Sequence, residues 1–274
     1  LDEISGLVEW PNPLYGEIED RFMGLPDEVL EASIRTHQKY LTTSDAGTGD
    51  LARGFVVVSN RLADSDRDAV ILAGNQRVLR ARLADAEFFW DEDRKTPLDA
   101  MLPRLADITF YEGLGSVHEK AMRMENLVAH MAPAIPHCDA EMAAHAAKLA
   151  KADLVSGMVG EFPELQGIMG GHYARHHGVA ADIADAIEQH YRPKGADDSI
   201  PDCATGLAVS LADKIDSLVG FFGVGAKPTG SKDPFALRRA ALGVIRIIRE
   251  QNLRLALRPL LAAAASAHGF DAVN

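Results

Sequence analysis

Residues 203–222 read CATGLAVSLADKIDSLVGFF and predict a helix. Outward from this stretch, apolar residues at helical spacing and the Pro and Gly clusters between them predict further helices. These helices cover residues 75–93, 116–131, 140–157, 180–191 and 234–251. Strand signals vanish after about Gly74. The chain is therefore predicted to be mainly α.

Residues 1–72 predict a small α+β region instead. The stretch 7–10 (LVEW) favours a short strand ended by Pro11 and Pro13, and residues 55–58 (FVVV) favour a buried strand. Residues 27–40 predict a helix with Val29, Leu30 and Ile34 facing inward. One strand pair does not make a stable sheet alone, so we expect this region to be incomplete. The chain also begins at Leu1, so we interpret it as a piece of a longer protein.

Composition excludes several classes of protein. Hydrophobic residues make up 47% and charged residues 25%, as in an ordinary globular protein. The two cysteines, Cys138 and Cys203, form no C-x-x-C motif, which argues against a thiolate zinc site or a disulfide scaffold. No apolar run approaches the roughly 20 residues that span a bilayer. A reducing, cytoplasmic setting without a membrane is expected.

Two motifs suggest ligand binding only weakly. Residues 225–232 (GAKPTGSK) approach a phosphate-binding loop, but the Lys and the hydroxyl residue are transposed. A helix start with Asp233 as N-cap and Pro234 at the first helical position is favoured there. His172, His176 and His177 have one-turn spacing but lack the Glu of H-E-x-x-H, which favours solvated histidines.

Three helical segments carry a more specific pattern: 151–155 (KADLV), 187–191 (IEQHY) and 208–214 (AVSLADK). They resemble the His-Asp, later His and terminal Asp helices of the HD superfamily, whose members bind divalent metal in a helical bundle. Ala152 stands where the resemblance requires His. The resemblance therefore implies an HD-domain-like bundle with a degenerate site, of which Asp153, His190 and Asp213 remain, and we expect no metal there. An HD-type metal-dependent phosphohydrolase is the alternative function.

Longer stretches extend over nearly the whole chain. They are 7–11 (LVEWP), 36–40 (THQKY), 57–60 (VVSN), 74–90 (GNQRVLRARLADAEFFW), 95–98 (KTPL), 151–171 (KADLVSGMVGEFPELQGIMGG) and 229–248 (TGSKDPFALRRAALGVIRII). Together they resemble the β-subunit family of the bacterial heterotetrameric (α2β2) glycyl-tRNA synthetase.

This second resemblance implies most of the functional expectations. The family's α subunit holds the ATP and glycine site, so ATP and Mg are expected at the α subunit, with no catalytic residue and no cofactor in this chain. The β subunit chiefly recognises tRNA, so the implied partners are the α subunit and tRNA(Gly). Residues 1–72 would be the C-terminal part of an editing-like α+β domain similar to that of the phenylalanyl enzyme's β subunit. Residues 73–252 would be the HD-like helical domain, and residues 253–274 the start of an anticodon-binding domain.

Charge is segregated along the chain. The formal net charge is −12, yet residues 226–258 carry eight bases against two acids, so this segment is +6 and the remainder −18. A basic stripe on an acidic protein is typical of a tRNA binder. The candidate tRNA-binding residues are Lys227, Lys232, Arg238, Arg239, Arg246 and Arg249, with Arg77 and Arg80 as a second cluster.

Two alternatives to tRNA contact remain open for these bases: surface ion pairs, and contact with a neighbouring domain. A scaffold that touches no RNA is a third functional hypothesis. In the helix 234–251, the expected buried stripe consists of Leu237, Ala241, Val244, Ile245 and Ile248, while Leu242 and Ile247 break the pattern.

Overall fold

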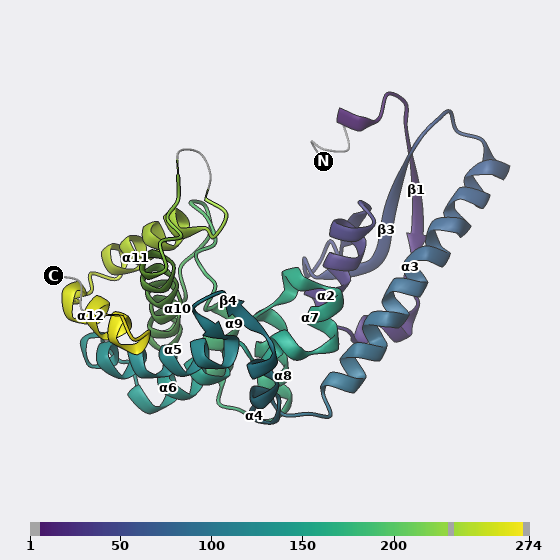
Figure 1. The fold of residues 1–274 in the computed structure, drawn as a ribbon. Helices are drawn as coiled ribbons and strands as arrows, with labels where there is room; N and C mark the ends of the chain where they lie inside the picture. The colour runs from purple at the N-terminus through teal and green to yellow at the C-terminus, as the bar shows by residue number, and fades with distance from the viewer. Residues whose placement is uncertain (1–5, 230–232, 271–274) are drawn as a thin grey trace. The chain divides into compact units, whose positions relative to one another are not determined.

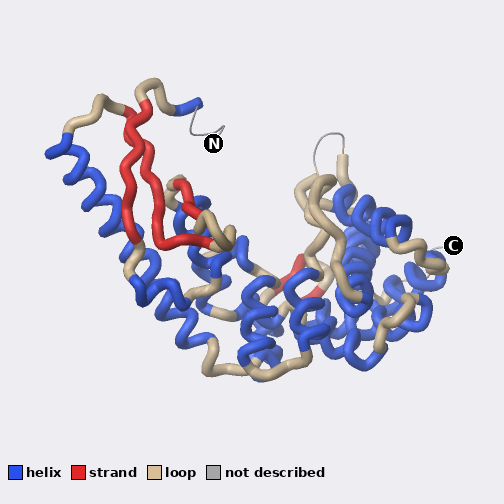
Figure 2. The backbone as a smooth tube through the Cα atoms, turned by 180° about the vertical axis from the view of Figure 1, so that it is seen from behind, coloured by secondary structure: helices blue, strands red, loops and turns tan. Residues whose placement is uncertain are grey.

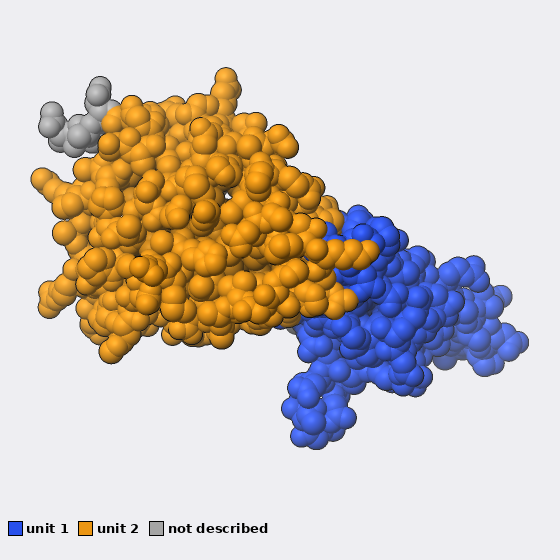
Figure 3. Space-filling view, turned by 90° about the horizontal axis from the view of Figure 1, so that it is seen from below, with its two compact units in different colours: residues 1–93, 161–165 blue, residues 94–160, 166–274 orange. Residues whose placement is uncertain are grey.

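The computed structural model describes residues 6–229 and 233–270. The chain divides into two compact units (Figures 1 and 3). Unit 1 consists of residues 1–93 and 161–165, and unit 2 of residues 94–160 and 166–274. The predicted fold class is confirmed: the protein is mainly α, with a small sheet near its start (Figure 2).

The sheet of unit 1 has three antiparallel strands in the order β1-β3-β2. They are β1 (Pro11–Glu17), β2 (Leu41–Ser44) and β3 (Leu51–Asn60). The prediction of a strand at 7–10 was wrong, because the strand begins at Pro11 where that prediction ended it. In the described sheet β1 pairs only with β3, with Pro11 opposite Asn60 and Pro13 opposite Val58. An edge strand tolerates proline because one row of its N–H groups has no ladder partner.

The helices of unit 1 cover a small apolar core. They are η1 (Asp20–Gly24), α2 (Asp27–Glu31), its π-helical continuation η2 (Ala32–His37) and α3 (Ser65–Asp93). Val29, Leu30 and Ile34 are buried as predicted, and the Tyr40 ring stacks on buried Phe55 with centroids 5.4 Å apart. Helix α3 begins at Ser65, well before the predicted start at residue 75.

Unit 2 is a bundle of helices with one short hairpin. The helices are α4 (Leu98–Met101), α5 (Val117–Met131), α6 (Ala140–Leu149), α7 (Gly157–Glu161), α8 (Ile168–His176), α9 (Ala181–Gln189), α10 (Ala204–Gly223), α11 (Leu237–Glu250) and α12 (Leu257–Ala267). The hairpin joins β4 (Thr109–Tyr111) to β5 (Gly115–Ser116). Short 3-10 turns η3 (Leu102–Asp107), η4 (Ala132–Ala134), η5 (Ala152–Val155) and η6 (Pro163–Leu165) link helices, the last lying in unit 1.

Helix α10 is the centre of unit 2. It packs against α5, α6, α9, α11 and α12, and every residue from Thr205 to Asp216 is buried. The helix predicted at 203–222 is thereby confirmed, with the Cys203 sulfur accepting from the Gly206 N–H at 3.3 Å as its N-cap. Charged residues of this helix must therefore find partners inside the bundle.

Two other predicted helices differ from the structure. The helix predicted at 140–157 ends at Leu149 and is followed by η5, because the Lys151 and Asp153 side chains are buried and bonded inside the bundle. Helix α11 begins at Leu237, so Pro234 is not its first residue. The predicted cap is partly right, since the Asp233 carboxylate accepts from the N–H groups of Leu237 and Arg238 at 2.8 and 2.9 Å.

The three predicted domains remain a prediction. Residue 72 lies inside α3, and the compact units divide after Asp93. None of the described helices is long and apolar enough to cross a membrane.

Candidate functional site

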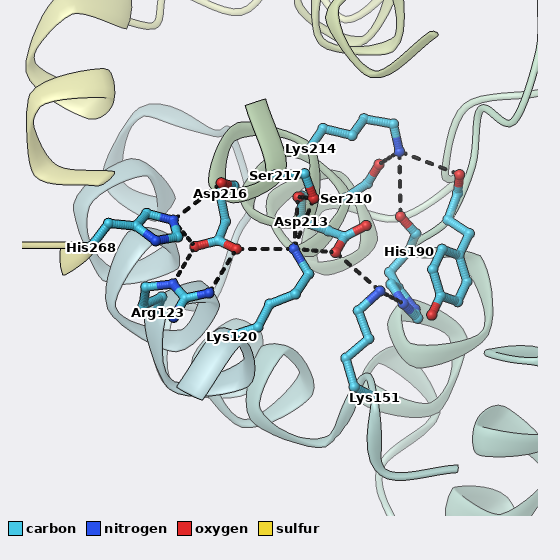
Figure 4. A network of polar contacts seen from close by, with 11 residues as sticks. Lys120, Arg123, Lys151, His190, Ser210, Asp213, Lys214, Asp216, Ser217 and His268 are labelled. Atoms are coloured by element: carbon cyan, nitrogen blue, oxygen red, sulfur yellow. Dashed lines mark hydrogen bonds and ion pairs between the residues drawn. The ribbon is translucent and has the colours of Figure 1, made fainter. Parts of the chain in front are cut away.

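Two carboxylates on α10 lie at the centre of a buried charged network (Figure 4). Asp213 and Asp216 are three residues apart and so share a face of the helix. Asp216 is fully buried; its Oδ1 lies 2.7 Å from Arg123 Nε and 3.0 Å from His268 Nε2, and its Oδ2 lies 3.0 Å from Lys120 Nζ. Burial opposes ionisation of Asp216, but Lys120, with hydrogen bonds from His268 and Arg123, holds the pKa of its carboxyl below the ordinary range.

Asp213 binds two ammonium groups at once. Its Oδ1 lies 3.0 Å from Lys151 Nζ and 3.1 Å from Lys120 Nζ. Burial again opposes ionisation, yet Lys120 and Lys151 hold the pKa of Asp213 well below its ordinary value. Lys120 thus bridges both carboxylates of α10, and its own pKa is raised because Asp213 and Asp216 outweigh the effect of burial.

His190 joins the network through Lys151. It follows α9 directly and is completely buried, with Nε2 2.8 Å from Lys151 Nζ. Burial, and next the charge of Lys151, lower the pKa of His190 well below its usual value. Burial also lowers the pKa of Lys151 to about 8, although the Asp213 carboxylate opposes this. The Lys151 ammonium lies 3.7 Å from the centroid of the Tyr191 ring.

Lys214 stabilises the turn that carries His190. Its ammonium donates to the carbonyl oxygen of Arg192 at 2.8 Å, to that of Tyr191 at 3.3 Å and to Ser210 Oγ at 2.9 Å. Burial lowers the pKa of Lys214 to about 8. The network thus ties α10 to α5, α9, α12 and the segment before η5.

Of the three predicted metal-site remnants, the structure brings two together. His190 and Asp213 meet at the Lys151 ammonium, whereas Asp153 bonds to the start of α8. Asp153 Oδ2 accepts from the N–H groups of Gly167 and Gly170 at 2.5 and 3.0 Å. Within residues 6–229 and 233–270, no group of three or more His, Cys, Asp or Glu side chains is placed to hold a metal ion.

Sequence reasoning missed most of this network. The resemblance points to Asp213 but not to its partners Lys120 and Lys151, which lie far from it in the sequence. One signal was present: Asp213, Lys214 and Asp216 interrupt a largely apolar helix, and charges inside such a helix need partners.

The candidate tRNA-binding residues of α11 occupy different environments. Arg238, Arg239 and Arg249 are exposed, as is Lys227 in the turn after α10. Arg246 is half-buried: its Nη1 donates to the carbonyl oxygens of Gly195, Ala196 and Asp198 at 3.0 to 3.1 Å, and its Nε donates to Glu250. Arg246 therefore holds a loop of its own unit. Lys232 lies outside the described residues.

The expected buried stripe of α11 needs correction. Leu237 and Val244 are buried as expected, and Leu242, expected outside the stripe, is 59% exposed. Ile245, expected inside the stripe, is 50% exposed, whereas Gly243 and Ile247 are buried. The stripe is rotated from the expected one because Gly243 faces α10, with Lys214 Cε and Cδ 2.8 and 3.1 Å from where a Cβ would stand. The exposed face thus mixes arginines with two large aliphatic side chains.

The second predicted cluster lies on α3 in unit 1. Arg77 and Arg80 are both exposed, and Arg80 forms an ion pair with Glu19. Nearby Arg82 pairs with Glu161. No described carboxylate pairs with Arg77, nor with Arg238, Arg239 or Arg249. Because α11 carries three such arginines and α3 only one, α11 is the stronger candidate for binding an anion.

Comparison with known proteins places the chain among its relatives. The family model described as "Glycyl-tRNA synthetase beta subunit" matches residues 1–273. The glycine–tRNA ligase beta subunit of Rhodospirillum centenum is 54% identical over 269 residues, which cover 97% of this chain and 37% of that protein. Those of Phenylobacterium zucineum and Pseudomonas syringae pv. tomato are 52% and 50% identical, over 94% of this chain and 39% and 37% of their own lengths. The chain therefore spans less than two fifths of these relatives.

Proposed function

The chain belongs to the glycyl-tRNA synthetase β-subunit family, and we propose that it is the central part of such a subunit, supporting ATP-dependent attachment of glycine to tRNA(Gly). Identity of about half its residues to the beta subunits, over 94 to 97% of its length, supports this proposal. The words "beta subunit" in the names of these relatives also imply a second, different subunit as a partner. The proposed partners are an α subunit, in an α2β2 assembly in the bacterial cytoplasm, and tRNA(Gly). We place the aminoacylation site, with ATP and Mg, on the α subunit.

The role proposed for this part of the subunit is to hold tRNA with the basic surface, defined as Lys227, Arg238, Arg239 and Arg249. The observation that carries it is the exposure of these cations without a described carboxylate partner, on a protein whose net charge is −12. Guanidinium groups suit phosphate oxygens because they are planar and weakly hydrated. A backbone contact of this kind contributes to affinity and to its salt dependence.

Charge reversal in the full-length β subunit tests this role. Arg238→Glu with Arg239→Glu is preferred to a variant at Arg246, whose guanidinium bonds to three carbonyl groups of its own unit. We expect the double variant to bind tRNA(Gly) more weakly and to lower the slope of log affinity against log salt by about one for each lost contact.

The matched control is Arg35→Glu with Arg67→Glu, which makes the same charge change at exposed side chains of unit 1. It should leave affinity and slope near those of the parent. A folded Arg238/Arg239 variant with the parent's affinity and slope would show that these arginines do not contact RNA. Contact with a neighbouring protein domain would then explain the exposed aliphatic residues of α11 better.

A further inference from the structure

The Lys151 ammonium group in unit 2 contacts side chains from two other segments of the chain (Figure 4). Lys151 precedes η5, His190 follows α9, and Asp213 lies in the middle of α10. The Lys151 nitrogen lies 2.8 Å from His190 Nε2 and 3.0 Å from Asp213 Oδ1. All three side chains are buried, so this is an interior binding site for a cation.

The protonation of His190 follows from its other neighbour. Nδ1 lies 2.6 Å from the carbonyl oxygen of Ile187, which can only accept a hydrogen bond, so Nδ1 carries the proton. Nε2 therefore presents a lone pair, and it accepts from the Lys151 ammonium. A carbonyl group that orients an imidazole in this way is the arrangement found behind metal-binding histidines.

The donor types at this site are those that a first-row divalent metal takes: an imidazole nitrogen and a carboxylate oxygen. A metal does not fit here, however, because both donor atoms already bind the ammonium. Lys120 Nζ adds a second positive charge 3.1 Å from Asp213 Oδ1. A dication would have to displace Lys151 and approach Lys120 inside the bundle, where charge repulsion is poorly screened.

We propose that Lys151 is the resident cation of this site: its ammonium occupies the position of a divalent metal, and the unaltered protein is closed to metal there. The HD-like residues then have a structural role, because the Lys151 ammonium joins His190, at the end of α9, to Asp213 of α10. The protein needs no metal to hold these helices, and restoring Ala152→His alone does not create a metal site, because the ammonium stays in place.

Shortening Lys151 tests the proposal by vacating the position. In the full-length β subunit, Lys151→Ala removes the ammonium and leaves His190 Nε2 and Asp213 Oδ1 facing the freed space. Lys120 still faces Asp213 in this variant and only two protein donors are freed, so we expect weak zinc binding, measured at equilibrium as a rise in melting temperature with added Zn²⁺. Lys151→Ala with His190→Ala should lose this effect. Lys151→Met, which fills the space without charge, should bind no zinc.

The parent protein gives a second, independent measurement. Its melting temperature should not change when a chelator is added. After equilibration with Zn²⁺, the parent should retain no more zinc than the His190→Ala variant does. Zinc retained by the parent and lost in His190→Ala would overturn the proposal. So would a folded Lys151→Ala variant that binds no zinc, or one whose zinc survives the loss of His190. If Lys151→Ala folds only with Zn²⁺, the proposal is supported; if it folds in neither condition, the parent's response to chelator and zinc decides.

Discussion

At the scale of single residues, two buried carboxylates of unit 2 have opposite ionisation preferences. Asp213 faces two ammonium groups, which hold its pKa well below the ordinary value. Asp153 receives only backbone N–H groups on Oδ2, and its buried Oδ1 has no hydrogen-bond partner among the described residues. Burial therefore raises the pKa of Asp153 to about 6. The bundle therefore disfavours the ionised form of Asp153, so the stability of the folded protein depends on pH.

We predict that Asp153→Asn becomes more stable relative to the parent as pH rises from about 4 to about 7. The folded parent holds the Asp153 proton up to a pKa of about 6, whereas the unfolded chain releases it near 3.8. The unfolded state therefore binds fewer protons in this window, and the parent loses up to about 3 kcal/mol as pH rises through it. Asparagine keeps the bonds from Gly167 and Gly170 without titrating.

Urea unfolding of both proteins at several pH values measures this difference. The control, Asp107→Asn, replaces an exposed carboxylate and should follow the parent. Parallel curves for Asp153→Asn and the parent would show that the pKa of Asp153 is the same in the folded and unfolded states, which would contradict the prediction.

The sequence allowed part of this site to be predicted. Resemblance identified His190 and Asp213, which do meet, because both lie in recognisable helical segments. Lys151 stands in the same quoted segment as Asp153, but its pairing depends on contacts with residues 39 and about 60 positions away, which no local pattern reveals. A lysine is normally exposed, so its burial also contradicts the usual preference of the residue.

At the scale of elements, α8 and α9 approach closely because two adjacent glycines lie between them. A Cβ on Gly170 would stand 2.7 Å from Ile187 Cγ2, and one on Gly171 would stand 2.8 Å from Glu188 Cβ and 3.2 Å from the carbonyl oxygen of Ala184. Such distances leave no room for a methyl group. This packing also fixes α9, whose end positions His190.

We predict that Gly171→Ala destabilises the protein by about 1 to 3 kcal/mol, the usual cost of overpacking. The matched control is Gly160→Ala in α7, where a Cβ meets nothing within 4 Å. That change should be neutral, or stabilising by up to about 1 kcal/mol, since alanine favours a helix over glycine. Denaturant midpoints of the two variants measure the contrast. Equal effects of the two substitutions would contradict close α8–α9 packing.

Helix ends were predictable where local chemistry sets them. The predicted start of α5 coincides with Ser116, which forms a capping box with Glu119. The C-terminal end of α6 and the start of α11 were not predictable, because the burial of Lys151 and the turn before Leu237 depend on tertiary contacts. The exposed Ile245 has the same explanation: which face of α11 is buried depends on where Gly243 meets α10.

At the scale of the whole molecule, charge is distributed unevenly between the ends of the chain. Residues 226–258 are +6 and the remainder is −18. In unit 1, Arg21, Arg53, Arg80 and Arg82 form ion pairs with nearby carboxylates. On α11, Arg238, Arg239 and Arg249 have no described carboxylate partner. An acidic protein that leaves one cationic surface unpaired is expected to bind an anion there.

The most direct measurement of the central claim is cross-linking of tRNA(Gly) to the complete enzyme, formed from the full-length β subunit and its α subunit, with cross-linked peptides mapped by mass spectrometry. We predict cross-links within residues 226–258, centred on Arg238, Arg239 and Arg249, and their loss at high salt. Cross-links confined to other segments, while peptides of 226–258 are recovered unmodified, would contradict the assignment of this surface to tRNA.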